Sequence, residues 1–248
     1  MTDPNHPRYF SLVVREKLTN GVRLGITSIS GLIAHGRGEA FDYLLGERTH
    51  PFAKSAVNAA AAFLLLSEKP VLSLNGNAAA LSSAYFIKIA KILDCPLEVN
   101  LYHHSKKRVE TIENFLGEKA GRHLLKSSKY EKMVIPGIAS RRKITIREGI
   151  GKADCVLVPL EDGDRCRAMT AMGKTVIAID LNPLSRTARS ARVTIIDNIV
   201  RCMPQLALKI AEMKKFPRSR LEKISKNYDN RLVIKQALKA MCYHKNNE

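Results

Sequence analysis

From Pro70 onward the chain alternates short, continuously apolar runs with segments of helical pattern. The runs "VLSL", "VLVPL", "TVIAI" and "VTII" do not show the strict polar alternation of a strand with one face in water. Strands that are buried on both faces are typical of parallel sheets with helices packed against each side. The alternation therefore predicts an α/β fold with a mainly parallel sheet and helices on both faces.

The parts of the chain on either side of this core also have helical patterns. We expect a helix that stops at Gly21 and an alanine-rich helix from Pro51 to about Leu66. With 248 residues, no internal repeat and no low-complexity linker, we expect one domain. It would consist of a helical part over 1–69, a core over 70–215 and a basic, helix-prone tail over 216–248.

Start and stop signals place the helices of the core. We expect a serine to cap "SSAYFIKIAKIL", Ser105 to cap "KKRVETIENFLG", which Gly117 closes, and Pro204 to open "PQLALKIAEMKK". "PLEVNLY" is expected to be a strand. Residues 120–150 are expected to form a loop with one short strand.

The stretch "HGRGEAFDYL" places Arg37 between two glycines, just before a helical pattern. Gly36 and Gly38 permit a positive φ and a close approach of the backbone to a ligand. A turn of this kind at a helix start would combine free N–H groups, the helix dipole and a guanidinium, which together favour an anion. The alternative is a glycine turn whose arginine faces water.

Polar clusters follow several of the predicted strands, and in parallel sheets ligands bind beyond the carboxyl ends of the strands. In "IDLNPLSRTA", Asp180 ends a strand and Ser185, Arg186 and Thr187 offer donors for phosphate oxygens. The alternative is an Asx turn beside a solvated arginine. Asn75-Gly76-Asn77 is either an anion site or an ordinary turn.

The cluster "EDGDR" holds Glu161, Asp162 and Asp164 within four positions. Such carboxylates bind Mg²⁺ together with water and phosphate, or else favour a helix N-terminus. The later bidentate glutamate of a calcium loop is missing, so we exclude that site. The sequence has no Walker motif and no complete dinucleotide fingerprint, and it offers no metal-ligand spacing.

Composition excludes some classes of protein. The net charge of +18 suggests nucleic acid, but the charge is concentrated away from the motifs, at 101–152 (13 basic, 5 acidic) and 211–248 (10 basic, 4 acidic). There is no tryptophan and no aromatic interleaving that would stack bases, so nucleic-acid binding is not the expected role. No apolar run has the length of a membrane span, and no signal peptide is expected. Five dispersed cysteines fit a reducing cytoplasm.

Four longer strings occur in a fixed order: "GLIAHGRGEAFDYLLGE", "VLSLNGNAAAL", "ADCVLVPLEDGDR" and "VIAIDLNPLSRTA". From about Pro7 to about Lys215 the chain resembles the archaeal phosphopantothenate synthetases, also called 4-phosphopantoate–β-alanine ligases. The resemblance implies a Rossmann-like fold, a homodimer, and the ATP-dependent joining of 4-phosphopantoate to β-alanine in coenzyme A synthesis. It also implies an acyl-adenylate intermediate, with AMP and pyrophosphate as products.

Matched motif by motif, the resemblance implies a set of ATP contacts: Arg15, Arg37, Asp180, Leu181, Asn182, Arg186, Thr187, Asp197 and Asn198. Because ATP and phosphopantoate are both anions, we expect the three arginines to converge, with Mg²⁺ neutralising the triphosphate. We assign His35, Asn75 and Asn77 to phosphopantoate as a hypothesis, and Asp162 and Asp164 to Mg²⁺ or the β-alanine ammonium. No residue is nominated as the general base. Two alternatives stay open: another nucleotide-using enzyme for a phosphorylated small molecule, and a basic RNA-binding protein.

Overall fold

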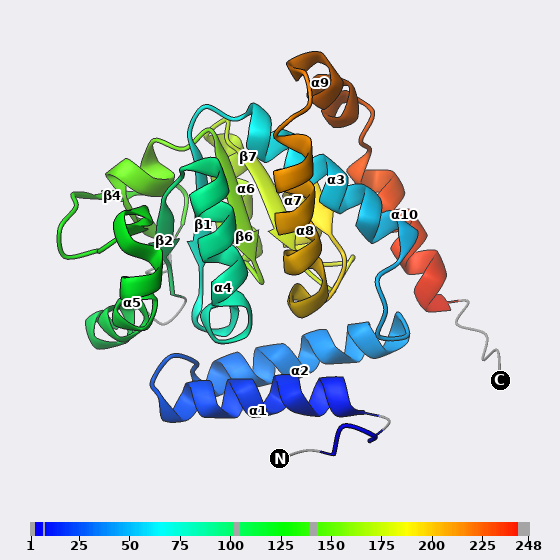
Figure 1. Cartoon of the computed structure of the whole chain (residues 1–248), viewed down its shortest axis with the longest axis horizontal. Helices are drawn as coiled ribbons and strands as arrows, with labels where there is room; N and C mark the ends of the chain where they lie inside the picture. Colours follow the sequence, from blue (N-terminus) through cyan, green and yellow to red (C-terminus); the bar gives the residue numbers. More distant parts are fainter. Residues whose placement is uncertain (1–2, 7, 102–104, 139–142, 243–248) are drawn as a thin grey trace.

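The structure, a computed structural model, describes residues 3–6, 8–101, 105–138 and 143–242. Its centre is a six-stranded sheet in the order β3-β2-β1-β6-β7-β8, and all neighbouring strands run parallel (Figure 1). The strands are β1 (Pro70–Leu74), β2 (Leu97–Val99), β3 (Leu124–Leu125), β6 (Cys155–Pro159), β7 (Thr175–Ile179) and β8 (Val193–Ile195). This order is that of a doubly wound, Rossmann-like sheet, so the predicted fold class is confirmed.

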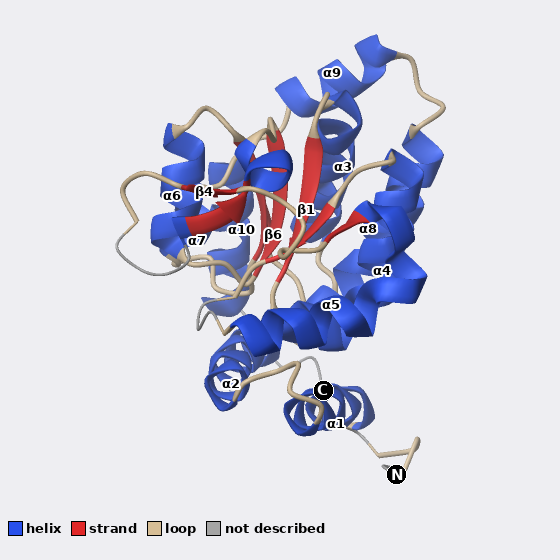
Figure 2. Cartoon of the chain, turned by 90° about the vertical axis from the view of Figure 1, so that its left-hand side faces the viewer, coloured by secondary structure: helices blue, strands red, loops and turns tan. Residues whose placement is uncertain are grey.

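Helices cover both faces of the sheet, as the unbroken burial of the strands requires. Figure 2 shows α3 (Pro51–Leu66), α4 (Gly76–Leu93) and α8 (Ile199–Met213) on one side of the strands, with α6 (Gly163–Ala171) and α7 (Arg186–Ser190) on the other. Alternate residues of a strand serve the two sides: Leu72 belongs to the first apolar core and Val71 to the second. No helix in the described part of the chain is long and apolar enough to cross a bilayer.

Two N-terminal helices, α1 (Tyr9–Arg23) and α2 (Ile29–Leu44), lie side by side across the edge of the sheet where β1 and β6 end (Figure 1). α1 passes through Gly21 instead of stopping there, so that expectation is wrong. A Cβ at Gly21 would lie 2.6 Å from Oγ1 of Thr27. The glycine therefore permits a close approach of the chain and does not end the helix.

Three other helix boundaries differ from expectation. α4 starts at Gly76 and is capped by Asn75, while Ser82 lies inside it with the non-helical torsions φ −142° and ψ 15°. α5 (Lys106–Ala120) continues through Gly117, and Ser105 makes no side-chain cap. α8 starts at Ile199 after an Asn198 cap, which leaves Pro204 in its interior. In α4 and α8 the cap is an asparagine close behind the end of a strand, and this signal outweighs the serine and proline signals nearby.

Residues 120–150 contain more strand than expected. β3 joins the main sheet, while β4 (Lys132–Val134) and β5 (Ile144–Ile146) form a separate antiparallel pair. A buried carboxylate holds this pair against the sheet: Glu98 on β2 accepts hydrogen bonds from Oγ1 of Thr145 at 2.5 Å and from the amide of Ile150 at 2.8 Å. The contact joins residues about fifty positions apart, so no local pattern predicts it.

The basic tail packs as two helices, α9 (Arg218–Lys226) and α10 (Asn230–Cys242), of which α9 lies at the amino-terminal edge of the sheet and α10 beside α3 (Figure 1). Leu221, Tyr228, Val233 and Ala237 are buried and belong to the same apolar core as α3 and α8. The tail thus completes the core with its apolar residues, although its surface is basic.

Candidate active site

The stretch around Arg37 lies inside α2 and not at a helix start. α2 begins at Ile29, where Oγ of Ser28 accepts a hydrogen bond from the amide of Gly31 at 3.1 Å. Neither Gly36 nor Gly38 has a positive φ. The predicted glycine turn with free N–H groups at Arg37 is therefore wrong. Because a helix has 3.6 residues per turn, His35 and Arg37 point about 160° apart.

A cavity of about 530 Å³ opens at the carboxyl ends of β1 and β6. These two strands are neighbours, and the chain leaves them in opposite directions, through α4 to β2 and through α6 to β7. This is the switch point of a doubly wound sheet, where ligands bind in this fold. The walls are formed by Ser28, Ser30, Gly31, Ala34, Arg37, Asn75, Gly76, Asn77, Leu101, Arg108, Leu160, Glu161, Asp162, Asp164 and Arg186.

A larger hollow, of about 730 Å³, lies at the opposite edge of the sheet. It is bordered by the amino ends of β1 and β6 and by the start of α9, with Lys69, Lys152 and Arg218 among its residues. Strands direct their carboxyl ends, not their amino ends, at ligands in doubly wound folds. We therefore place the functional site at the smaller cavity.

The cavity combines cations and carboxylates. Arg37, Arg108 and Arg186 come from α2, α5 and α7, and the carboxylates follow β6. Nη1 of Arg186 donates to Oδ1 of Asp164 at 2.7 Å, with both side chains more than half exposed. An exposed pair of this kind contributes little to stability and exchanges readily for a ligand. The first turns of α2 and α4 also border the cavity, which favours anions there.

A fully buried arginine fixes one carboxylate in the cavity wall. Nη1 of Arg165 donates to Oε2 of Glu161 at 2.5 Å, and the two side chains are 0% and 3% exposed. Oε1 of Glu161 accepts from the amide of Asp162 at 2.7 Å. Among the residues that the structure describes, Nε and Nη2 of Arg165 have no hydrogen-bond partner. The pair holds the loop after β6 in one orientation.

Asn75 and Asn77 line the cavity, and their side chains also form hydrogen bonds that hold neighbouring elements together. Asn75 caps α4 through Oδ1, and its Nδ2 donates to the carbonyl of Pro159 at 2.8 Å. Nδ2 of Asn77 donates to the carbonyl of Gly31 at 2.8 Å. These bonds join α4 to β6 on one side and to α2 on the other, so the asparagines set the shape of the cavity.

The loop after β7 leads to Arg186, which lines the cavity, while the residues of the loop itself lie behind the wall. Asp180 accepts hydrogen bonds from the amide of Asn182 at 3.0 Å and from Oγ of Ser185 at 2.5 Å. Burial raises the pKa of Asp180, and those two hydrogen bonds and the charge of Arg37 act against the rise. Oγ1 of Thr187 donates to the carbonyl of Glu161 at 2.8 Å, which joins this loop to the one after β6. The side chain of Leu181 lies against α2 at Gly38.

Eight of the predicted site residues do not line the cavity. Four of them follow β7, namely Asp180, Leu181, Asn182 and Thr187, and the other four are Arg15, His35, Asp197 and Asn198. Arg15 donates from Nε to Oε1 of Glu39 at 2.9 Å, where α1 meets α2. His35 lies near this pair on the same side of α2, and burial lowers its pKa. The expected convergence of three arginines therefore holds for Arg37 and Arg186 and not for Arg15.

Asp197 and Asn198, which follow β8, face the last turns of α2. Nδ2 of Asn198 donates to Oδ2 of Asp42 at 2.8 Å, and Oγ1 of Thr49 donates to Oδ2 of Asp197 at 2.7 Å. Arg201 pairs with both Asp42 and Asp197. The two residues lie on the same edge of the sheet as the cavity, but their side chains are engaged within the protein.

Comparison with known proteins identifies the family of this chain. The profile of the phosphopantothenate/pantothenate synthetase family matches residues 52–244, which is more than half of the chain. The chain belongs to this synthetase family. It is 49% identical over 234 residues to the 4-phosphopantoate–β-alanine ligase of Thermococcus kodakarensis, covering 94% of this chain and 89% of the relative. It is 46% identical over 246 residues to the ligase of that name from Methanosarcina mazei, covering 98% and 96%.

The family match confirms the resemblance carried by the four strings. One cavity residue that they do not contain is Arg108, which lies in the basic segment 101–152. The sequence indicates a helix here and a high positive charge, but it assigns no functional role to this segment. Only its position on α5, beside the start of α4, brings it to the site.

Proposed function

We propose that this member of the synthetase family is a cytoplasmic ATP-dependent ligase that joins 4-phosphopantoate to β-alanine and yields 4′-phosphopantothenate for coenzyme A biosynthesis. The proposal is carried by one observation: a cavity of mixed charge at the switch point of a chain that shares 46–49% identity with archaeal ligases of that name. Arginines suit the two anionic substrates, and carboxylates suit a metal-bound triphosphate or an ammonium group.

The reaction would proceed in two balanced steps. A carboxylate oxygen of phosphopantoate attacks the α-phosphorus of ATP, and pyrophosphate leaves as the acyl adenylate forms. The amine of β-alanine then attacks the acyl carbon and AMP leaves. The amine proton passes to solvent or to a basic group. The chain contributes mainly by orienting the reactants and by stabilising charge at the α-phosphate.

The two halves of the sheet would hold different substrates. We assign ATP to the β7 side of the switch point, with Arg37, Arg186, Asp180 and Thr187 and the adjacent Leu181 and Asn182. Phosphopantoate would then lie on the β1 side, next to Asn75 and Asn77. The proposed contacts of Arg15, Asp197 and Asn198 with ATP, and of His35 with phosphopantoate, have the least support. These residues lie outside the cavity wall, whereas Thr187 and Asp180, also outside it, interact with Glu161 and Arg37 in the wall.

Mg²⁺ fits the carboxylates of the cavity as a companion of ATP. Among the described residues no group of three or more His, Cys, Asp or Glu side chains could form a resident metal site. Asp162 and Asp164 both line the cavity, however, and Mg²⁺ in nucleotide sites is commonly held by one or two carboxylates plus phosphates and water. When bound, the ion would neutralise charge on the triphosphate. The alternative role of these two carboxylates is to bind the β-alanine ammonium.

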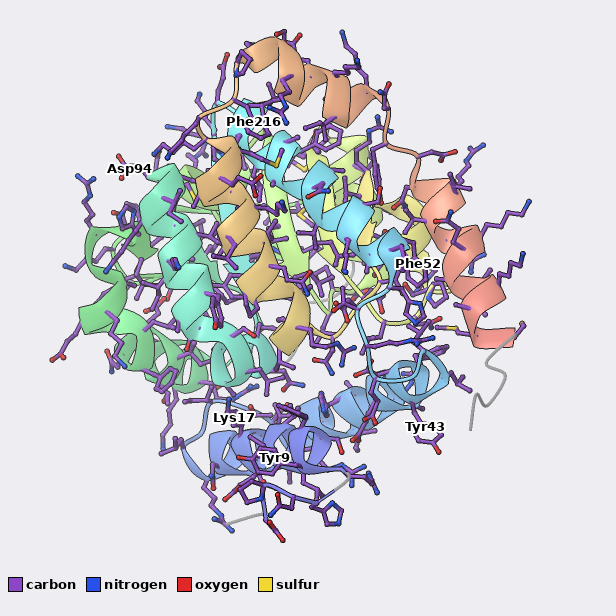
Figure 3. The ribbon with its side chains drawn as sticks, turned by 45° about the vertical axis from the view of Figure 1, so that its right-hand side comes forward. Tyr9, Lys17, Tyr43, Phe52, Asp94 and Phe216 are labelled. Atoms are coloured by element: carbon purple, nitrogen blue, oxygen red, sulfur yellow. The ribbon has the colours of Figure 1, made fainter. Side chains whose placement is uncertain are left out.

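We also propose that the protein is a homodimer that associates through α2. Ile29, Ile33 and Tyr43 are 71%, 66% and 72% exposed, and with Leu44 they form one outward face of the helix. Figure 3 shows Tyr43 pointing away from the rest of the molecule. A continuous apolar helix face exposed to water is typical of an association surface. A second copy placed there would lie close to the cavity, because Arg37 is on the adjoining side of the same helix.

The test is an assay with ATP, Mg²⁺, 4-phosphopantoate and β-alanine, followed by chromatography of the nucleotides. AMP and 4′-phosphopantothenate should appear in equal amounts. Without β-alanine, labelled pyrophosphate should still exchange into ATP if an acyl adenylate forms. ADP in place of AMP would contradict the proposal and indicate a phosphoryl transfer instead.

A further inference from the structure

We propose that Arg108 binds the phosphate group of 4-phosphopantoate, together with the amide N–H groups of Gly76 and Asn77 at the start of α4. The inference rests on the proposed function and deepens it, because it assigns one end of one substrate to a defined part of the cavity.

Arg108 is placed beside the first residue of α4. It lies in the first turn of α5, and its Nη2 donates to the carbonyl of Ile26 at 3.0 Å. The same Nη2 is 3.2 Å from the position that a Cβ of Gly76 would occupy. The guanidinium is half-buried, and burial lowers its pKa. An arginine still stays protonated in proteins, so a fixed, partly desolvated positive charge stands at this wall of the cavity.

The start of α4 offers two N–H groups next to that charge. Asn75 satisfies the amide of Ala78 with its side chain and the amide of Ala79 with its carbonyl. The amides of Gly76 and Asn77 have no acceptor among the residues that the structure describes. Both residues line the cavity, where the guanidinium of Arg108 stands beside them. A phosphate oxygen is the acceptor that such amides bind in other proteins.

The charged residues of the cavity provide different binding positions for the two ends of the substrate. Arg108 stands on the β2 side of the switch point, and Arg186 stands on the β7 side beside Asp164. Glu161 and Asp162 follow β6, which lies between these two sides of the sheet. 4-Phosphopantoate carries a phosphate at one end and the reacting carboxylate at the other. With the phosphate at Arg108, its carboxylate points to the side that we assign to ATP.

The test compares the variant Arg108→Gln with the wild-type enzyme for three ligands. Loss of a charged hydrogen-bond donor to phosphate should raise Kd and KM for 4-phosphopantoate by about 10- to 100-fold. The KM for ATP should not change. Pantoate lacks the phosphate, so its binding should not change either, and the preference of the enzyme for the phosphorylated acid should fall by the same factor. Binding is measured by calorimetry without ATP, and turnover by release of AMP.

The matched control is Lys107→Gln, which removes the same charge from the exposed neighbouring position of α5 and should leave all three ligands unaffected. If Arg108→Gln does not fold, Arg108→Lys keeps the charge and should raise only the constants for 4-phosphopantoate. Unchanged binding of 4-phosphopantoate, or an equal loss for ATP or pantoate, overturns the assignment and leaves the ligase proposal intact. A wild-type enzyme that neither binds 4-phosphopantoate nor releases AMP overturns both.

Discussion

Arg165 shows how far a single residue of this chain depends on its partner. It is completely buried, and it pairs with Glu161 in the wall of the cavity. Removing one member of a buried pair leaves the other charge without compensation. Arg165→Met should therefore lower the free energy of unfolding by about 3–5 kcal/mol. Urea denaturation measures this, and Arg167→Met, on the exposed side of the same helix, should change it by less than about 0.5 kcal/mol.

The five cysteines differ sharply in their surroundings. Cys95, Cys155, Cys166 and Cys202 are buried, and Cys242 is exposed. Burial raises the pKa of the Cys95 and Cys166 thiols to about 12, so both stay protonated at pH 8, and the thiolate is the reactive form. A thiol reagent at pH 8 should therefore modify one cysteine rapidly in the native protein and all five after denaturation. Rapid native modification of two or more would contradict the packing of the sheet.

Gly76 in α4 and Gly117 in α5 differ in the space around them, although both lie in helices. A Cβ at Gly76 would lie 2.3 Å from the carbonyl oxygen of Ile26, whereas a Cβ at Gly117 would meet nothing within 4 Å. Gly76→Ala should thus destabilise the protein by about 1–3 kcal/mol through overpacking. Gly117→Ala should stabilise it by about 0.5–1 kcal/mol, because alanine is the better residue in a helix interior. Thermal denaturation of the two variants should give melting shifts of opposite sign.

The outer face of α2 is apolar, and we propose that two copies of the chain associate through it. If a second copy covers this face, Ile33→Glu should convert a dimer to a monomer, since it places a charge in the centre of the contact. Light scattering after size-exclusion chromatography gives the mass directly. Leu232→Glu is the control, because Leu232 is also exposed but lies on α10. A wild-type monomer at micromolar concentration would reject the proposed dimer.

At the scale of the whole chain we propose that residues 1–248 form one domain. α9 and α10 pack against α3, and α1 packs against α4, so the terminal helices share a core with the sheet. A single domain should unfold in one transition, with the same midpoint by circular dichroism and calorimetry. An early, separate loss of helix would indicate that the tail or the N-terminal pair unfolds independently.

The sheet and its polar edge are predictable from the sequence. Uninterrupted apolar runs such as 175–179 have few ways to be buried other than as parallel strands between helices, and the polar clusters that contain Asp162 and Arg186 come after such strands. Because the strands run parallel, these clusters lie at the same edge of the sheet. There Nη1 of Arg186 donates a hydrogen bond to Oδ1 of Asp164. The family resemblance rests on the same local strings.

The other side chains that reach this edge depend on how the helices pack. The glycines around Arg37 lie in a regular helix, so Arg37 faces the cavity while His35 faces away from it. Arg15 lies on α1, outside the cavity wall. Arg108 reaches the site through a contact with Ile26, 82 residues away, and no local pattern indicates it. Periodicity is a property of neighbouring residues, whereas the direction of a helical side chain depends on how the whole helix packs. The sequence could therefore predict the location of the site and its charge, but not the full set of residues around it.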